Sequence, residues 1–279
     1  MRREKLRIAI YDRDVEYSRR LMNYLNDRYG KHMDVAVFTK KDSLLEESRE
    51  HGFECIVTDD ASYMEDTDVI RICEEETEDG FYRYSSARLL AERILERQKP
   101  DLSYGTGEGK MIAVYSPAGG IGKTAYALKK AEELDGIYFG MEDFCSLETK
   151  DYWMEQLLFL VREREENICE QMQQHLQWLD GVRVLPSARC FLDYRYMKKA
   201  DYEWLFEKLR EERKQSVIFD IGVGSLTDFQ ILDLFDQVLL LTSEEGRRWQ
   251  KMQVFLQLIH QMSPGIRSKI TFIPEGNLG

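Results

Sequence analysis

The sequence predicts an α/β fold with two domains, each a mainly parallel sheet flanked by helices. Short apolar runs alternate with segments of helical periodicity along the chain, which is typical of βαβ units. A polar, glycine-containing stretch at residues 99–109 interrupts this alternation, and we expect a linker there. The chain has 279 residues, enough for two hydrophobic cores. We therefore place a first domain at residues 1–98 and a second at residues 110–279.

The composition argues against several classes of protein. A net charge of −12 argues against non-specific binding to nucleic acid, which requires a basic surface. The five cysteines are scattered without metal-ligand spacing, so we expect reduced thiols and a cytoplasmic protein. The apolar run near the N-terminus is too short for a signal peptide, and no run approaches the ~20 apolar residues of a membrane span. Direct insertion into a membrane is therefore not expected.

The first domain is expected to contain five strands and three helices. Short apolar runs predict the strands, and apolar residues at helical spacing predict the helices. The expected strands are residues 6–11, 33–38, 54–58, 69–73 and 81–84. The expected helices are residues 15–28, 43–51 and 85–98. The segment between the last two strands is too short and too acidic for a full helix, so one helical layer is expected to be reduced.

Aspartates follow two neighbouring strands of this domain, at the sheet edge where α/β proteins place their sites. Asp12 follows the first strand, and Asp59 and Asp60 follow the third. They are either solvated loop carboxylates or a site that forms an aspartyl phosphate. The pattern resembles the receiver domain of response regulators, with Asp12 in the acidic pair and Asp59 as the phosphoacceptor. Arg13 and Arg83 replace the second acid and the lysine of that family, which implies a receiver-like domain that is not phosphorylated.

A glycine-rich turn follows the first expected strand of the second domain, residues 111–115, and a helix is expected directly after the turn. Glycines let the backbone turn tightly, so that successive N–H groups and a helix N-terminus converge on one anion. The residues expected to bind ATP in this way are Gly119, Gly120, Ile121, Gly122, Lys123, Thr124 and Ala125. The alternative is a purely structural strand, turn and helix.

Two side chains of this turn, and one aspartate far along the chain, are expected to have specific roles. Lys123 would reach the β- and γ-phosphates of ATP, and the Thr124 hydroxyl would bind Mg²⁺. Asp220 ends an apolar strand at residues 216–220 and would supply the second metal-binding group. Pro117 stands where the usual pattern has its first glycine, which removes one N–H from the turn.

The rest of the second domain is expected to continue the alternation of strands and helices. Further strands are expected at residues 136–141, 181–186, 237–242 and 269–273. A long helical region is expected at residues 150–180, and helices at residues 202–214 and 247–262.

The segment SPAGGIGKT resembles the deviant Walker A loop of the MinD/ParA family of dimeric P-loop ATPases. The resemblance implies ATP binding and a homodimer linked to the nucleotide. In that family a signature lysine crosses to the partner's nucleotide, and Ala118 takes its place here. The resemblance also implies an aspartate that positions the attacking water; Asp143 is the best match, with Glu142 or neither as the alternatives.

The order of the two domains resembles that of the TadZ/CpaE proteins, which help to localise type IV (Tad) pilus assembly. This resemblance implies a positional or assembly factor with slow or absent ATP hydrolysis, which meets pilus assembly or secretion proteins at a pole or a membrane. Arg189, Arg247 and Arg248 are candidates for a substitute cation, with solvated surface arginines as the alternative. Two other functions stay open: a signalling ATPase controlled by phosphorylation, and a scaffold that does not hydrolyse ATP.

Overall fold

The computed structural model describes residues 5–60, 68–77, 79–97, 109–149, 151–212, 215–243 and 246–275. The chain forms two compact units. Unit 1 comprises residues 1–99 together with residues 178–181, and unit 2 comprises residues 100–177 and 182–279. The linker predicted at residues 99–109 lies, except for Gly109, outside the described residues.

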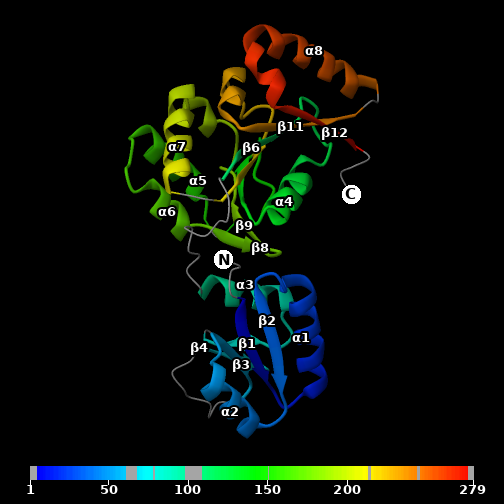
Figure 1. Ribbon diagram of the computed structural model, residues 1–279, viewed down its shortest axis with the longest axis vertical. Helices are drawn as coiled ribbons and strands as arrows, with labels where there is room; N and C mark the ends of the chain where they lie inside the picture. The colour runs from blue at the N-terminus through cyan, green and yellow to red at the C-terminus, as the bar shows by residue number, and fades with distance from the viewer. Residues whose placement is uncertain are drawn as a thin grey trace. The chain divides into compact units, whose positions relative to one another are not determined.

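Unit 1 is built on a five-stranded sheet with the order β2-β1-β3-β4-β5, which is the flavodoxin-like order (Figure 1). All of its strand pairs are parallel. Its strands are β1 (Leu6–Tyr11), β2 (Met33–Phe38), β3 (Cys55–Thr58), β4 (Asp68–Cys73) and β5 (Phe81–Tyr82). Its helices are α1 (Val15–Tyr29), α2 (Lys41–His51) and α3 (Ala87–Arg97). The described residues between β4 and β5 form no helix, as their length and acidity predict.

The two faces of this sheet carry separate cores because successive side chains of a strand point to opposite faces. Ile8 and Ile10 of β1 pack into the core that contains the apolar residues of α1 and α3. Ala9 packs into a smaller core with Leu44 of α2. The alternation along β1 thus allows helices to pack on both faces of the sheet. In such sheets, sites lie at the carboxyl ends of the strands.

Unit 2 contains most of a second sheet, which has seven strands in the order β12-β11-β6-β10-β7-β9-β8. The strands of this sheet are β6 (Met111–Tyr115), β7 (Ile137–Met141), β8 (Gln177–Leu179), β9 (Val182–Leu185), β10 (Val217–Ile221), β11 (Gln237–Thr242) and β12 (Ile270–Pro274). The α-helices of unit 2 are α4 (Lys123–Glu133), α5 (Trp153–Arg162), α6 (Ile168–Gln174), α7 (Lys199–Glu212) and α8 (Gly246–Met262). Three short 3₁₀ helices were not predicted: η1 (Asp193–Tyr196), η2 (Phe229–Leu234) and η3 (Pro264–Lys269).

The middle of the second sheet consists of β6 and β10, which are parallel neighbours and are buried along their whole length. Strands buried on both faces read as continuous apolar runs, and this is why the sequence predicts both of them well. Their register pairs Asp220 with Val114, so the aspartate lies near the end of β6 where the glycine-rich turn begins. In Figure 1, α5, α6 and α7 pack against one another beside this sheet.

The long helical region predicted at residues 150–180 is wrong in its second half. The structure has two short helices, α5 and α6, and then the strand β8. Arg164 takes a left-handed φ of 58° just after α5, which ends the helix. Asp180 and Gly181, with φ of 48° and 82°, form the two-residue loop that joins β8 to β9, a conformation that favours a tight hairpin. Apolar spacing alone did not reveal these turns.

The cysteines and the helices bear on the expectations drawn from composition. All five cysteines are free, and Cys55 and Cys169 are buried as small apolar side chains. Among the described helices, none combines the length and the apolar character that crossing a bilayer requires.

Candidate functional site

The glycine loop, residues 116–122, joins the end of β6 to the start of α4. Gly120 and Gly122 have φ of 68° and 85°, a left-handed backbone that other residues adopt only at a cost. Ile121 between them is buried and anchors the loop to the core. Upstream, the Ser116 hydroxyl accepts a hydrogen bond from the Ala118 N–H at 3.2 Å, so this donor is used within the loop. The loop is therefore held at its base and exposed at its tip.

Lys123 begins α4 directly after the loop and is half-buried. Within the part of the chain that the structure describes, its amine makes no hydrogen bond or ion pair. Gly119 and Gly120 beside it are exposed, as is Ala125. A cation and a helix N-terminus thus meet at one open surface, which favours an anion.

Thr124 connects the loop to two carboxylates on neighbouring strands. Its hydroxyl oxygen lies 2.6 Å from Oδ2 of Asp220, at the end of β10, and 2.9 Å from Oε1 of Glu142, which follows β7. A threonine hydroxyl has one proton to donate, so it serves only one of these carboxylates at a time. Each carboxylate has one further hydroxyl donor, since Glu142 accepts from Ser146 at 2.7 Å and Asp220 accepts from Tyr138 at 3.0 Å.

Asp220 is fully buried, and its two oxygens differ in their surroundings. Oδ2 accepts hydrogen bonds from Thr124 and from the Tyr138 hydroxyl at 3.0 Å. Oδ1 has no hydrogen-bond partner among the described residues. Burial raises the pKa of the Asp220 carboxyl, against the opposing effects of the Thr124 hydrogen bond and the charge of Lys123. A buried carboxylate with one unsatisfied oxygen is costly unless a cation compensates it.

These groups fit a divalent cation of the kind that prefers oxygen ligands. Thr124, Asp220 and Glu142 offer a hydroxyl and two carboxylates, and the unsatisfied Oδ1 of Asp220 gives the observation that such an ion would explain. The sequence predicted Thr124 and Asp220 for this role. It offered Glu142 only as an alternative to Asp143, because two acidic residues in a row follow β7 and only packing shows which one turns toward Thr124.

Asp143 makes different contacts. Its Oδ1 accepts hydrogen bonds from the N–H groups of Gly224 at 2.6 Å and Ser225 at 3.3 Å. A side chain on Gly222 would come within 2.2 Å of this oxygen, so the close approach requires glycine. Asp143 therefore ties the end of β7 to the loop that follows β10.

Ala118, at the position of the family's signature lysine, is only 3% exposed, so its neighbours already enclose its side chain. The three candidate arginines lie in different places. Arg189 pairs with Glu155 of α5 at 3.2 Å. Arg247 lines a cavity of about 500 Å³ beside the end of β6. Arg248 donates from Nη2 to the Gly120 carbonyl oxygen at 3.3 Å, a hydrogen bond to the glycine loop itself.

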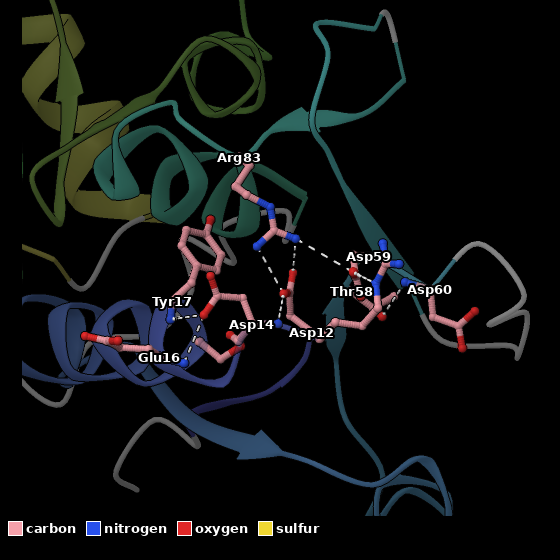
Figure 2. A network of polar contacts seen from close by, with 10 residues as sticks. Asp12, Asp14, Glu16, Tyr17, Thr58, Asp59, Asp60 and Arg83 are labelled. Carbon is pink, nitrogen blue, oxygen red and sulfur yellow. Dashed lines mark hydrogen bonds and ion pairs between the residues drawn. The ribbon is translucent and has the colours of Figure 1, made fainter.

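Unit 1 has a second cluster of charges, at the carboxyl ends of β1 and β3 (Figure 2). Asp12 is 3% exposed, and its two oxygens accept hydrogen bonds from Nη1 and Nη2 of Arg83 at 3.0 and 2.8 Å. The guanidinium also lies over the Tyr17 ring, 4.9 Å from its centroid. Asp14, next to this pair, caps α1 by accepting from the N–H groups of Glu16 and Tyr17. Arg83 thus binds Asp12 through a two-pronged, charge-assisted contact.

Asp59 completes this cluster. Its side chain is 5% exposed and pairs with Nε of Arg13 at 2.6 Å, while Nη2 of Arg83 lies 3.7 Å away. Asp60 turns aside and pairs with Lys41 at 3.1 Å. The alternative of a solvated carboxylate is therefore wrong for Asp12, which is buried, and the carboxylate of the partly buried Asp59 is paired with arginine.

No protein-family model matches the chain, and no curated protein matches it. Solved structures of similar fold include a ParA family ATPase from Chlorobium tepidum TLS, with 16% identity, 60% of this chain and 74% of that chain covered, and a TM-score of 0.47. A putative plasmid partition protein from Borrelia burgdorferi bound to AMPPNP is 13% identical. The likeness covers 60% of this chain and 76% of that chain, with a TM-score of 0.41. The MinD cell division protein of Aquifex aeolicus has 16% identity, 60% and 69% coverage, and a TM-score of 0.39. Likeness at this level does not decide function, so the assignment depends on the geometry of the site.

Proposed function

We propose that the glycine loop and the start of α4 bind ATP together with Mg²⁺. The observation that carries this proposal is the Thr124 hydroxyl shared between two carboxylates, with a buried oxygen of Asp220 left unsatisfied. It lies at the N-terminus of α4, directly after a loop whose glycines take the left-handed backbone of an anion-binding turn. A merely structural turn gives no reason for two carboxylates to share the Thr124 hydroxyl while a buried carboxylate oxygen stays unsatisfied.

Each part of the site then has a role in the proposal. The loop residues Gly119 to Gly122, with Ala125, offer backbone N–H groups to the phosphates, and the Lys123 amine neutralises their charge. Thr124 and Asp220 hold Mg²⁺, with Glu142 beside them. When bound, the metal neutralises charge on the β- and γ-phosphates.

We further propose that ATP turnover is slow. Stabilising the charge on the transferring phosphoryl group is the main work of such a site, and a cation in trans can contribute ~10³–10⁵ in rate. Ala118 cannot supply that cation. Lys123 remains as the catalytic cation of its own subunit. Asp143 stays the residue predicted to position water, although its Oδ1 already accepts a hydrogen bond from the loop after β10.

At a finer level, we propose a cytoplasmic positional or assembly factor for a Tad-type pilus. Its domains would be the receiver-like residues 1–98, the linker 99–109 and the ATPase residues 110–279. The glycine-loop sequence and the domain order support this proposal. It includes a homodimer linked to ATP, and pilus assembly or secretion proteins as partners that bring it to a pole or a membrane.

The test is calorimetric titration of the purified chain with ATP and Mg²⁺, with light scattering to report mass. Lys123→Ala should weaken ATP binding at least tenfold, about 1.4 kcal/mol, because a phosphate-facing cation is lost. Lys129→Ala removes the same charge further along α4 and should leave the affinity nearly unchanged. Equal affinities for wild type and Lys123→Ala would refute the nucleotide site.

A further inference from the structure

We infer that Arg248 of α8 is a positioning residue that holds the glycine loop in its anion-binding conformation. The inference rests on the proposed ATP site and names a residue that controls it. The guanidinium bridges two segments of unit 2: Nη2 donates to the Gly120 carbonyl oxygen at 3.3 Å, and Nη1 pairs with Oε1 of Glu275 at 2.8 Å. A helix far along the chain thus contacts the tip of the loop.

The geometry of the peptide bond links this contact to the direction of the Ile121 N–H. The described chain has no cis peptide bond, and in a trans peptide the carbonyl and the following N–H point in opposite directions. Because the Gly120 carbonyl is directed at Arg248, the N–H of Ile121 is directed away from Arg248. The contact therefore sets the direction of one of the N–H groups that the proposal assigns to phosphate binding.

The peptide bond between Gly120 and Ile121 can rotate unless a contact fixes its orientation. Gly120 has a φ of 68°, and a glycine moves between left-handed and right-handed backbone more freely than any other residue. If the peptide on its C-terminal side rotated, a carbonyl would replace an N–H at the phosphate surface. An interaction that fixes the binding conformation beforehand raises affinity by reducing the ordering cost of binding.

The chemistry of the side chain suits the role. A guanidinium presents several N–H donors in a rigid fork, so one arginine can serve the carbonyl and the Glu275 carboxylate together. The Glu275 charge balances that of Arg248, and the contact is to a carbonyl oxygen. Arg248 therefore acts on the loop through its backbone, whereas the sequence had suggested a substitute cation for the phosphates.

The experiment compares Arg248→Ala with Arg247→Ala in the full chain, by calorimetry with ATP and Mg²⁺ and with adenosine alone. Both variants remove one positive charge from the same turn of α8, but the hydrogen bond to the Gly120 carbonyl comes from Arg248, whereas Arg247 lines the neighbouring cavity. Arg248→Ala should weaken ATP binding about five- to tenfold, as expected for one charge-assisted hydrogen bond. Arg247→Ala should change it less than about twofold, and adenosine binding should be the same in both variants.

A spectroscopic measurement separates positioning from general damage. The amide resonance of Ile121 should shift in Arg248→Ala and not in Arg247→Ala, and Arg248→Lys should recover part of the ATP affinity because it still donates to the carbonyl. Equal losses in the two alanine variants, or an unshifted Ile121 amide, would overturn the inference. Wild-type protein that fails to bind ATP would instead overturn the proposed function itself, so the two failures are distinguishable.

Discussion

Two buried aspartates occupy equivalent places in the two units, at the carboxyl ends of central parallel strands. Asp12 lies at the end of β1 in unit 1, and Asp220 lies in β10 of unit 2. Asp12 is compensated from within the chain, since Arg83 contacts both of its oxygens. Asp220 receives two hydroxyl donors on one oxygen and nothing on the other among the described residues.

The two aspartates therefore differ in how their charge is compensated. We call Asp12 with Arg83 the closed pair, and the surroundings of Asp220 the open site. A carboxylate bound by a guanidinium is already neutralised, so the unit 1 cluster gives no reason to take up a metal ion or a phosphoryl group. A buried carboxylate with an unsatisfied oxygen destabilises the folded state, and a bound cation offsets that destabilisation. Stability is therefore expected to depend on the first pair, and ligand binding on the second aspartate.

Breaking the closed pair should have the largest effect. Arg83→Met leaves Asp12 buried and unpaired, which should lower the free energy of unfolding by about 3–5 kcal/mol. Urea unfolding followed by circular dichroism measures this change. Arg13→Met is the control, because Arg13 is 85% exposed and solvent screens its pair with Asp59, so this variant should change the stability far less. Similar costs for the two variants would show that Asp12 does not depend on Arg83, and Asp12→Asn with Arg83→Met should recover part of the loss.

The open site should respond in the opposite direction. Asp220→Asn removes a buried charge, so without Mg²⁺ it should raise the free energy of unfolding by about 0.5–2 kcal/mol. Functional sites commonly lower the stability of a protein, and substitutions there can therefore stabilise it. The same variant should lose the Mg²⁺ dependence of ATP binding. Thermal unfolding and calorimetry measure the two effects. Destabilisation of the metal-free protein by Asp220→Asn would contradict the assignment of Asp220 as a buried carboxylate whose charge is only partly compensated.

The pH dependence of the metal-free protein sharpens the same prediction. Burial raises the pKa of Asp220 in the folded state, so the folded protein holds this proton more tightly than the unfolded chain. Its contribution to stability is present below the ordinary aspartate pKa of about 4 and is lost as the pH rises through the raised pKa. This loss should be absent in Asp220→Asn and reduced by Mg²⁺.

The smallest effect is expected from phosphoryl donors on unit 1. Incubation with acetyl phosphate or beryllofluoride should leave the NMR spectrum around Asp59 unchanged, because Arg13 and Arg83 already surround its carboxylate. A stoichiometric phosphoprotein that disappears in Asp59→Asn would contradict this, and it would favour the signalling ATPase over the slow switch.

The sequence by itself predicted the α/β class, nearly all strands and the glycine loop. Strands buried on both faces are continuous apolar runs, and the left-handed turns at Gly120 and Gly122 require glycine, so local chemistry carries these features. It failed at residues 150–180, where a helix break at Arg164 left no mark in the apolar spacing.

Tertiary structure alone decided which charges meet. Arg83 and Asp12 are 71 residues apart in the chain, and Arg248 and Gly120 are 128 apart. Such contacts depend on strand order and on which way each side chain turns at a strand end, and residue type and local spacing do not encode either. For the same reason, adjacent acids after β7 could not be told apart until packing turned Glu142 toward Thr124.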